Sequence, residues 1–181
     1  SISGICCGEG AAVVVAPSPA GGSLVIETAA LGLEAHESVA GETRHAGTAQ
    51  DAPVTLVDYD VFAMGALARV AQVAGALDAA LARSVEYANE RQQFGRALGK
   101  FQAVQQALAT FAGEAAATNC AAMGAAQAMG RRSAAFAVAA AKLRANRAIG
   151  VGTAVAPQVH GAIGFTQEYP LHQLTRRLWA W

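Results

Sequence analysis

Arg91 opens the first segment whose residue types and spacing suggest chemistry, Arg91-Gln-Gln-Phe-Gly95, at the junction of two long helical patterns. A guanidinium keeps its charge at physiological pH and presents a planar fork of donors, which suits a pyrophosphate group. Phe94 can supply an apolar wall beside a bound cofactor, and Gly95 permits a tight exit from the segment. The alternative is a solvated Arg91 that complements the C-terminal end of a helix dipole.

A second segment, Gln158-Val-His-Gly-Ala-Ile-Gly-Phe-Thr-Gln-Glu-Tyr-Pro170, offers a neutral amide followed by a glycine turn. Gly161 and Gly164 let the backbone approach a bulky phosphate closely, although a simple helix-ending turn accounts for the same two glycines. We expect a structural role for His160, because no carboxylate or cysteine is placed beside it. The segment therefore offers binding groups, and we assign no catalytic residue to it.

The first third of the chain, residues 1–58, has the pattern of β-structure or irregular chain. Short apolar runs bounded by proline or glycine turns predict three strands. The polar stretch from Glu37 to Ala52 contains two glycines and predicts a loop. Because three short strands cannot bury both faces alone, this segment is expected to pack against the helices, another chain or residues outside this sequence. The expected strands cover residues 11–16, 23–27 and 54–57.

From Tyr59 the apolar period changes from 2 to 3.6 residues, which predicts helices. Asp58 or Asp60 can cap the first helix, and Pro170 occupies the favoured first position of a short last one. The expected helices run from Tyr59 to Arg91, from Phe101 to Met129, from before Phe136 to Gly161, and from Pro170 to Trp179. Their expected core faces are Phe62, Leu67, Val70, Ala74, Leu77, Leu81 and Val85 on the first helix, Phe101, Val104, Leu108, Phe111 and Ala115 on the second, and Phe136, Ala140 and Leu143 on the third.

Three long antiparallel helices and a short fourth predict an up-down bundle. The expected fold class is therefore mainly α, with a bundle over residues 59–181 preceded by a short, partial β segment over residues 1–58.

Composition argues against several classes of function. The 13 basic side chains balance the 13 acidic ones, so neither a nucleic acid nor a membrane surface is expected as a partner. Four scattered histidines and the lack of a C-x-x-C motif argue against a metal centre. The cysteines Cys6, Cys7 and Cys120 suggest a reducing compartment, and we expect Cys120 to be buried. Since we recognise neither an apolar run of transmembrane length nor a signal-like start, the protein is expected to be cytoplasmic.

In their order and spacing, the two segments resemble the C-terminal domain of the acyl-CoA dehydrogenases, flavoenzymes that desaturate acyl thioesters. The resemblance extends from about Val57 to Trp179. It implies a bundle that binds FAD and carries subunit contacts, with Arg91 and Phe94 reaching FAD held largely by a neighbouring subunit. Ala162 stands where the family usually has a second glycine. The cofactor-binding positions that the resemblance implies are Arg91, Gln93, Phe94, Leu98, Phe101, Gln158, Val159, Gly161 and Ala162.

The resemblance does not supply a catalytic base. Desaturation needs a carboxylate to remove the α-proton while the β-hydrogen leaves as hydride to the flavin. Most members carry this Glu in a Tyr-Glu-Gly-Thr segment that would follow Trp181, and a minority carry it early in the first long helix, where Gly65 stands here. Ala63 and Ala66 occupy positions where the family often has polar contacts to CoA. The bundle carboxylates Glu86, Glu90 and Glu114 are expected to be surface charges, so no catalytic residue is assigned.

These features favour an FAD-binding subunit of a heteromeric acyl-CoA dehydrogenase, in an α2β2 assembly whose partner subunit supplies the catalytic Glu. The hypothesis implies an acyl-CoA substrate, of a fatty acid or a bulky steroid type, an electron-transfer acceptor, and an inactive isolated chain. Two alternatives stay open. One is a piece of a homomeric acyl-CoA dehydrogenase with its base outside this sequence, and the other is a flavin-free helical scaffold.

Overall fold

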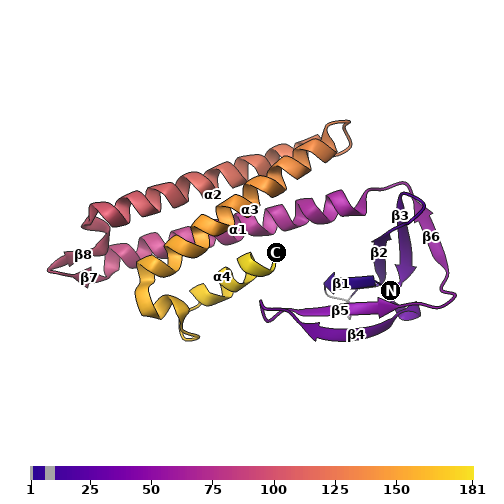
Figure 1. Cartoon of the computed structure of the whole chain (residues 1–181), viewed down its shortest axis with the longest axis horizontal. Helices are drawn as coiled ribbons and strands as arrows, with labels where there is room; N and C mark the ends of the chain where they lie inside the picture. The colour runs from indigo at the N-terminus through magenta and orange to yellow at the C-terminus, as the bar shows by residue number, and fades with distance from the viewer. Residues whose placement is uncertain (1, 7–10) are drawn as a thin grey trace. The chain divides into compact units, whose positions relative to one another are not determined.

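The computed structural model describes residues 2–6 and 11–181. The chain divides into two compact units, Ser1–Gly65 and Ala66–Trp181. Strands dominate the first unit and helices dominate the second (Figure 1). The predicted fold class, a mainly α bundle preceded by a short β segment, is confirmed.

The first unit contains two antiparallel sheets of three strands each. One has the order β1-β5-β4 and the other the order β2-β3-β6. In the second sheet, Ser23 pairs with Pro17 on one side and with Val57 on the other. The three predicted strands are therefore confirmed and belong to a single sheet. The strands are β1 (Ile2–Cys6), β2 (Val13–Pro17), β3 (Ser23–Glu27), β4 (Gly32–Glu37), β5 (Thr43–Thr48) and β6 (Val54–Val57).

The prediction of a loop from Glu37 to Ala52 is wrong, because β5 lies inside it and pairs with both β1 and β4. In β5 the two buried positions are His45 and Gly47, and its other residues are exposed or half-buried. A half-buried strand is predicted from alternating large apolar residues. Because the inward positions of β5 are histidine and glycine, the sequence lacks that pattern.

Ser23 ties this second sheet to the start of the first helix. The Ser23 hydroxyl donates to the carbonyl of Tyr59 and accepts from the backbone N–H of Val61. Asp60, the residue just before α1, accepts from the N–H of Ala63 through its Oδ1 at 2.9 Å, which confirms Asp60 as the predicted capping residue. Both contacts fix where the helix begins.

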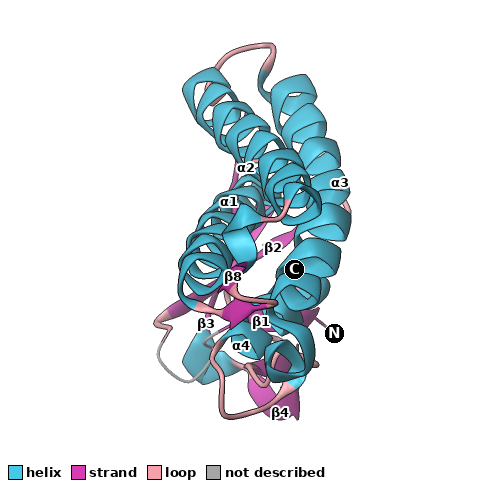
Figure 2. Ribbon diagram, turned by 90° about the vertical axis from the view of Figure 1, so that its left-hand side faces the viewer, coloured by secondary structure: helices cyan, strands magenta, loops and turns pink. Residues whose placement is uncertain are grey.

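The second unit is an up-down bundle of three long helices with a short fourth, as predicted (Figures 1 and 2). A short antiparallel hairpin and a 3-10 turn connect the first two helices, and a second 3-10 turn precedes the last one. Gly130, with φ of 78°, follows the end of the second helix. The elements are α1 (Val61–Glu90), β7 (Gln92–Gln93), β8 (Arg96–Ala97), η3 (Leu98–Lys100), α2 (Gln102–Ala128), α3 (Ala134–His160), η4 (Gly161–Phe165) and α4 (Leu171–Ala180).

Small residues build much of the bundle core. On α3 the buried positions include Ala141, Ala145, Ala148 and Gly152. A Cβ added at Gly152 would lie 2.6 Å from Leu77 Cδ2 and 3.0 Å from Phe111 Cε2, so α3 approaches its neighbours closely there. On α1 and α2 the predicted core positions Val70, Ala74, Leu77, Phe111 and Ala115 are confirmed.

The predicted core face of α3 is wrong. Phe136 is 80% exposed and Leu143 is 55% exposed, and Ala140 is also on the surface. Two residues predicted for the α1 core, Phe62 and Val85, are exposed as well. Close helix approach requires small side chains at the contact, so several alanines and Gly152 of α3 face inward, whereas the large side chains of Phe136 and Leu143 face out.

Two further expectations about single residues are corrected. Cys120 is exposed because it lies two residues beyond buried Thr118, a turn of roughly 200° around α2. Glu114 is not a free surface charge, since it is half-buried and pairs with Arg144 of α3. Of the two early cysteines, Cys7 lies outside the described residues.

Helix α1 is long and apolar enough to cross a bilayer by length and composition alone, with a mean hydropathy of 1.3 over its best window. This corrects the expectation that no apolar run reaches that length. A core helix meets the same criterion, and Val70, Val73 and Leu77 of α1 are fully buried in the bundle core.

Candidate functional site

The first candidate segment forms a tight hairpin directly after α1. The N–H of Arg91 donates to the carbonyl of Tyr87 at 2.9 Å, and the carbonyl of Arg91 accepts from the N–H of Leu98 at 2.9 Å. Between them, β7 pairs with β8 across a two-residue turn, Phe94-Gly95. Both turn residues have positive φ, 53° and 77°, which is the requirement of a type I′ hairpin. Arg91 therefore sits just beyond the last turn of α1, rather than within it.

The hairpin holds its key side chains out into solvent. Phe94 is 91% exposed although it is apolar. Among the residues that the structure describes, the guanidinium of Arg91 has no side-chain partner, and Gln93 is also exposed. A non-glycine residue in the left-handed region costs on the order of 1 kcal/mol of folding free energy, so Phe94 at the tip of the hairpin lowers the stability of the chain.

Phe101 supports the base of the hairpin. Its ring meets the ring of Phe94 edge-on, with centroids 6.2 Å apart, and the guanidinium carbon of Arg96 lies 4.1 Å from its centroid. Leu98 is half-buried in η3 beside it. The sequence reasoning missed Arg96, because its place above Phe101 depends on the fold of the hairpin.

The second candidate segment spans the end of α3 and the η4 turn. Gln158 is exposed on the last turn of α3, and Ala162 is exposed in η4. Gly161 has φ of 65° and ψ of −144°, a conformation open essentially to glycine alone, and a Cβ added there would meet nothing within 4 Å. Val159 is buried, so only its backbone is free to contact a ligand.

His160 is buried and held on several sides. Its Nδ1 lies 2.8 Å from the carbonyl of Ala156, its Nε2 lies 3.3 Å from the hydroxyl of Tyr169, and its ring stacks on Tyr87 at 4.5 Å. Burial lowers the pKa of His160, the bond to Ala156 opposes this, and the charge of Arg83 lowers it further. The expected structural role of His160 agrees with this geometry.

The two segments, far apart in the sequence, lie at the same end of the bundle, opposite the connection between α2 and α3 (Figure 1). That end presents a guanidinium, an exposed amide, an exposed aromatic ring and an open glycine backbone. These are groups that can bind an extended, anionic ligand with aromatic parts. The donor set therefore fits a dinucleotide such as FAD.

Carboxylates and metal ligands contribute little at this end. Glu86 and Glu90 on α1 are exposed, as predicted for surface charges. Near the start of α1, away from Glu86 and Glu90, Gly65 has no side chain, and a Cβ added there would meet nothing within 4 Å. Within residues 2–6 and 11–181, no group of three or more His, Cys, Asp and Glu residues could hold a metal ion.

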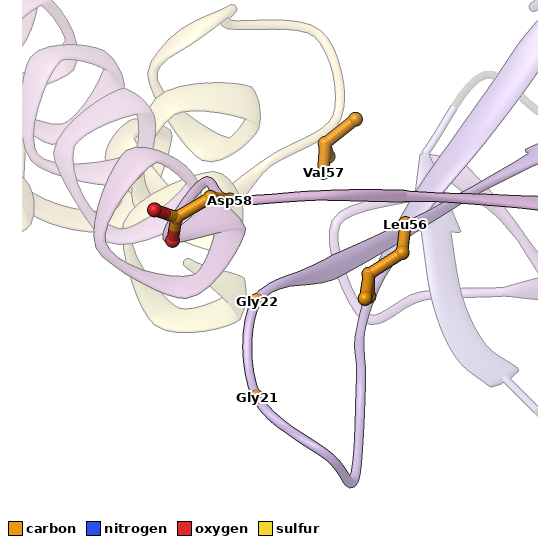
Figure 3. A pocket seen from close by; sticks show the side chains of 5 residues that line it. All are labelled: Gly21, Gly22, Leu56, Val57 and Asp58. Carbon is orange, nitrogen blue, oxygen red and sulfur yellow. The ribbon is translucent and has the colours of Figure 1, made fainter.

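A cavity of about 390 Å³ in the first unit contains none of the predicted site residues. It lies between the Gly21-Gly22 turn and the end of β6, where Leu56 and Val57 point to opposite sides of the strand (Figure 3). Asp58 is the only ionisable residue in its lining. With one carboxylate and little else that is polar, the cavity offers no constellation for catalysis.

Comparisons with known proteins give one family. The acyl-CoA dehydrogenase C-terminal domain family matches residues 56–180. Glutaryl-CoA dehydrogenase of Desulfococcus multivorans is 36% identical over 104 residues, which are 56% of this chain and 27% of the relative.

Solved structures agree over nearly the whole chain. The ChsE4-ChsE5 complex from Mycobacterium tuberculosis matches with a TM-score of 0.81 and 25% identity, over 97% of this chain and 52% of that chain. A variant of the Tcur3481-Tcur3483 steroid ACAD matches with a TM-score of 0.83 and 28% identity, over 93% of this chain and 50% of that one. This chain thus spans about half the length of the solved chains and about a quarter of the curated relative.

Proposed function

Because this chain belongs to the acyl-CoA dehydrogenase family, with residues 56–180 forming its C-terminal domain, we propose that it binds FAD and supports α,β-desaturation of an acyl-CoA thioester. The observation that carries the proposal is the β7–β8 hairpin. It keeps an apolar ring 91% exposed on a left-handed backbone, next to an arginine whose side chain has no partner among the described residues. Such a costly exposure is explained if a ligand covers the ring.

Each exposed group has a role in holding the cofactor. Arg91 would pair with the pyrophosphate through its guanidinium, and Phe94 would shield it from water. Leu98 and Phe101 provide an apolar surface for the adenosine part. From the other segment, Gln158 would donate an amide hydrogen bond to the cofactor, and the backbone at Gly161 and Ala162 would contact the flavin part. When bound, FAD accepts the hydride that leaves the β-carbon of the substrate.

We propose further that the catalytic carboxylate comes from a partner subunit in a heteromeric, α2β2 assembly. Gly65 occupies one of the two family positions for the base and cannot remove a proton. One of the similar solved structures is itself a complex of two proteins. Met123, Phe136 and Leu143 are large apolar side chains exposed on α2 and α3, and cover of these side chains by a second subunit would remove apolar area from water.

The proposal extends to the substrate class and to a second partner. A bulky acyl group of the steroid type is supported by the similarity to a steroid ACAD. The electrons taken up by the flavin require an electron-transfer acceptor, which completes the cycle.

A second candidate is a homomeric acyl-CoA dehydrogenase of which this sequence is one part. The observation that favours it is the coverage, since the chain matches about half of each similar solved chain, a glutaryl-CoA dehydrogenase among them. In that case the base belongs to the remaining part of the same polypeptide.

Copurification tests the proposal and separates the two candidates. The tagged chain is expressed in its native host, and absorbance near the flavin bands is measured with the mass of every copurifying polypeptide. We expect flavin only in fractions that contain a second, different dehydrogenase subunit, and no turnover by the chain alone. Flavin and turnover in a species containing a single kind of polypeptide favour the homomeric candidate, and a colourless preparation under all conditions rejects FAD binding.

A further inference from the structure

Three aromatic rings, from α1, from the end of α3 and from the turn before α4, meet where the two candidate segments come together. Tyr87 on α1 stacks on His160 at the end of α3, with centroids 4.5 Å apart and planes 26° apart. Tyr169, just before α4, lies 5.0 Å from the His160 ring and 6.3 Å from the Tyr87 ring. All three contacts fall in the range of favourable aromatic pairs.

Hydrogen bonds fix the central ring in one orientation. A backbone carbonyl can only accept, so the 2.8 Å contact with Ala156 places the proton of His160 on Nδ1. Nε2 is then the acceptor for the hydroxyl of Tyr169 at 3.3 Å. His160 is only 3% exposed, and this neutral tautomer satisfies both of its nitrogens.

Each ring is attached directly to one of the two segments. The carbonyl of Tyr87 accepts the N–H of Arg91 at 2.9 Å, so this hydrogen bond joins the residue that carries the ring to the start of the hairpin. His160 lies two residues after Gln158 and immediately before Gly161. The η4 turn folds back onto it, since a Cβ added at Gly164 would lie 3.0 Å from His160 Cβ.

We propose that Tyr87, His160 and Tyr169 form an aromatic clamp that fixes the distance between the Arg91 hairpin and the Gln158 turn, so that both can hold one FAD. The three are positioning residues, because they act through Arg91, Gln158 and Gly161. A site built from two separate helices keeps its affinity only while its groups stay within about 0.5 Å of the binding geometry. This inference rests on the proposed FAD binding.

Paired variants at one position provide the test, in the full chain purified with any subunit that accompanies it. Tyr87→Leu removes the stacked ring, whereas Tyr87→Phe keeps the ring and loses only a hydroxyl. The clamp predicts that FAD dissociates about tenfold more readily from Tyr87→Leu, and less than about twofold more readily from Tyr87→Phe. FAD titration by flavin fluorescence gives the dissociation constants.

A second measurement needs no cofactor. Hydrogen exchange in the apo chain reports on the N–H of Leu98, bonded to Arg91, and on the N–H of Thr166, bonded to Ile163. The clamp predicts faster exchange at both sites in Tyr87→Leu and unchanged exchange in Tyr87→Phe. Thr166 belongs to the second segment, which Tyr87 contacts through the rings of His160 and Tyr169, so its response reports coupling between the two segments.

The outcomes separate the clamp from the function on which it rests. FAD bound by the wild type and equally well by Tyr87→Leu overturns the clamp and leaves the proposed function intact. A wild type that binds no FAD overturns both. If Tyr87→Leu fails to fold, Tyr169→Phe takes its place, since it removes only the hydroxyl that reaches His160. An unchanged FAD affinity in Tyr169→Phe then counts against the clamp.

Discussion

Phe94 combines two features that folding alone does not favour. Its backbone has φ of 53°, where side chains with a Cβ are strained, and its ring is 91% exposed. Asparagine is the residue best suited to the first position of a type I′ turn before glycine. Phenylalanine at this position therefore indicates a requirement other than stability, and the proposed cofactor contact is such a requirement.

Replacement of this residue should separate stability from binding. We expect Phe94→Asn to raise the free energy of unfolding by about 0.5–1 kcal/mol, because strain in the left-handed region is relieved. The same substitution should weaken FAD binding, because the apolar wall is lost. Chemical denaturation and FAD titration of the same preparation measure the two effects. A variant that is both less stable and equally good at binding FAD would contradict this account of the hairpin.

His160 should make stability depend on pH. Burial and Arg83 lower its folded pKa, so the unfolded chain takes up a proton first on acidification. Stability is then fully present above about pH 6.5, the ordinary histidine pKa, and is lost as the pH falls toward the lower folded pKa. The groups that face the ring are Tyr87 and Arg83 on α1 and Tyr169 before α4.

Thermal melts between about pH 7.5 and 5.5, spanning that ordinary pKa, test this expectation. His160→Gln should flatten the dependence, whereas the exposed control His36→Gln should leave it as in the wild type. Equal slopes in the wild type and in His160→Gln would assign the pH dependence to other groups.

At the scale of elements, α3 shows how small residues set the spacing of the bundle. Its buried face includes four alanines and one glycine, Gly152, which lies against the side chains of Leu77 and Phe111. Gly150 lies two residues earlier on the exposed face, where an added Cβ meets nothing within 4 Å. The two glycines are matched in helix context and differ only in their surroundings.

Alanine substitutions at these two glycines should therefore have opposite effects. Gly150→Ala is expected to stabilise the chain by about 0.5–1 kcal/mol through helix propensity. Gly152→Ala is expected to destabilise it by about 1–3 kcal/mol, because the new methyl overpacks the core. Denaturant midpoints of both variants measure the difference. Stabilisation by Gly152→Ala would mean that α3 can move away from α1 and α2 without loss.

The helices and their ends could be predicted because period, caps and breakers agree along the chain. Asp60, Gly130 and Pro170 mark boundaries that depend only on local sequence. The buried face of α3 could not be predicted, since large apolar residues such as Phe136 face outward when close packing selects alanine. Strand β5 could not be predicted either, because its buried positions carry histidine and glycine instead of large apolar residues.

The two segments of the candidate site could be selected from the sequence for a local reason, and the role of their residues in binding FAD stays a prediction. Arg91, Phe94 and Gln158 belong to short motifs, each of which lies within a single segment and can be recognised from local sequence. The contacts that join those segments could not be anticipated, since Tyr87, His160 and Tyr169 meet only after three elements pack together. Arg96 was missed in the same way, because its contact with Phe101 requires the folded hairpin.

At the scale of the whole molecule, the bundle carries the groups proposed to bind FAD at one end and exposed apolar side chains on α2 and α3. Both features are incomplete by themselves. The binding groups lie exposed, and Met123, Phe136 and Leu143 have large apolar side chains in contact with water. A dehydrogenase assembly in which a second subunit covers these surfaces accounts for the two observations together.

The affinity for FAD of Arg91→Ala, in the assembly as purified, tests the central claim most directly. Arg132→Ala is the matched control, because Arg132 is also exposed but lies in the connection between α2 and α3, at the other end of the bundle. Loss of a charged hydrogen bond is worth about 1.5–3 kcal/mol, so Arg91→Ala should weaken FAD binding at least about tenfold, with no change in Arg132→Ala. Equal FAD affinity in the wild type and in both variants would contradict the account.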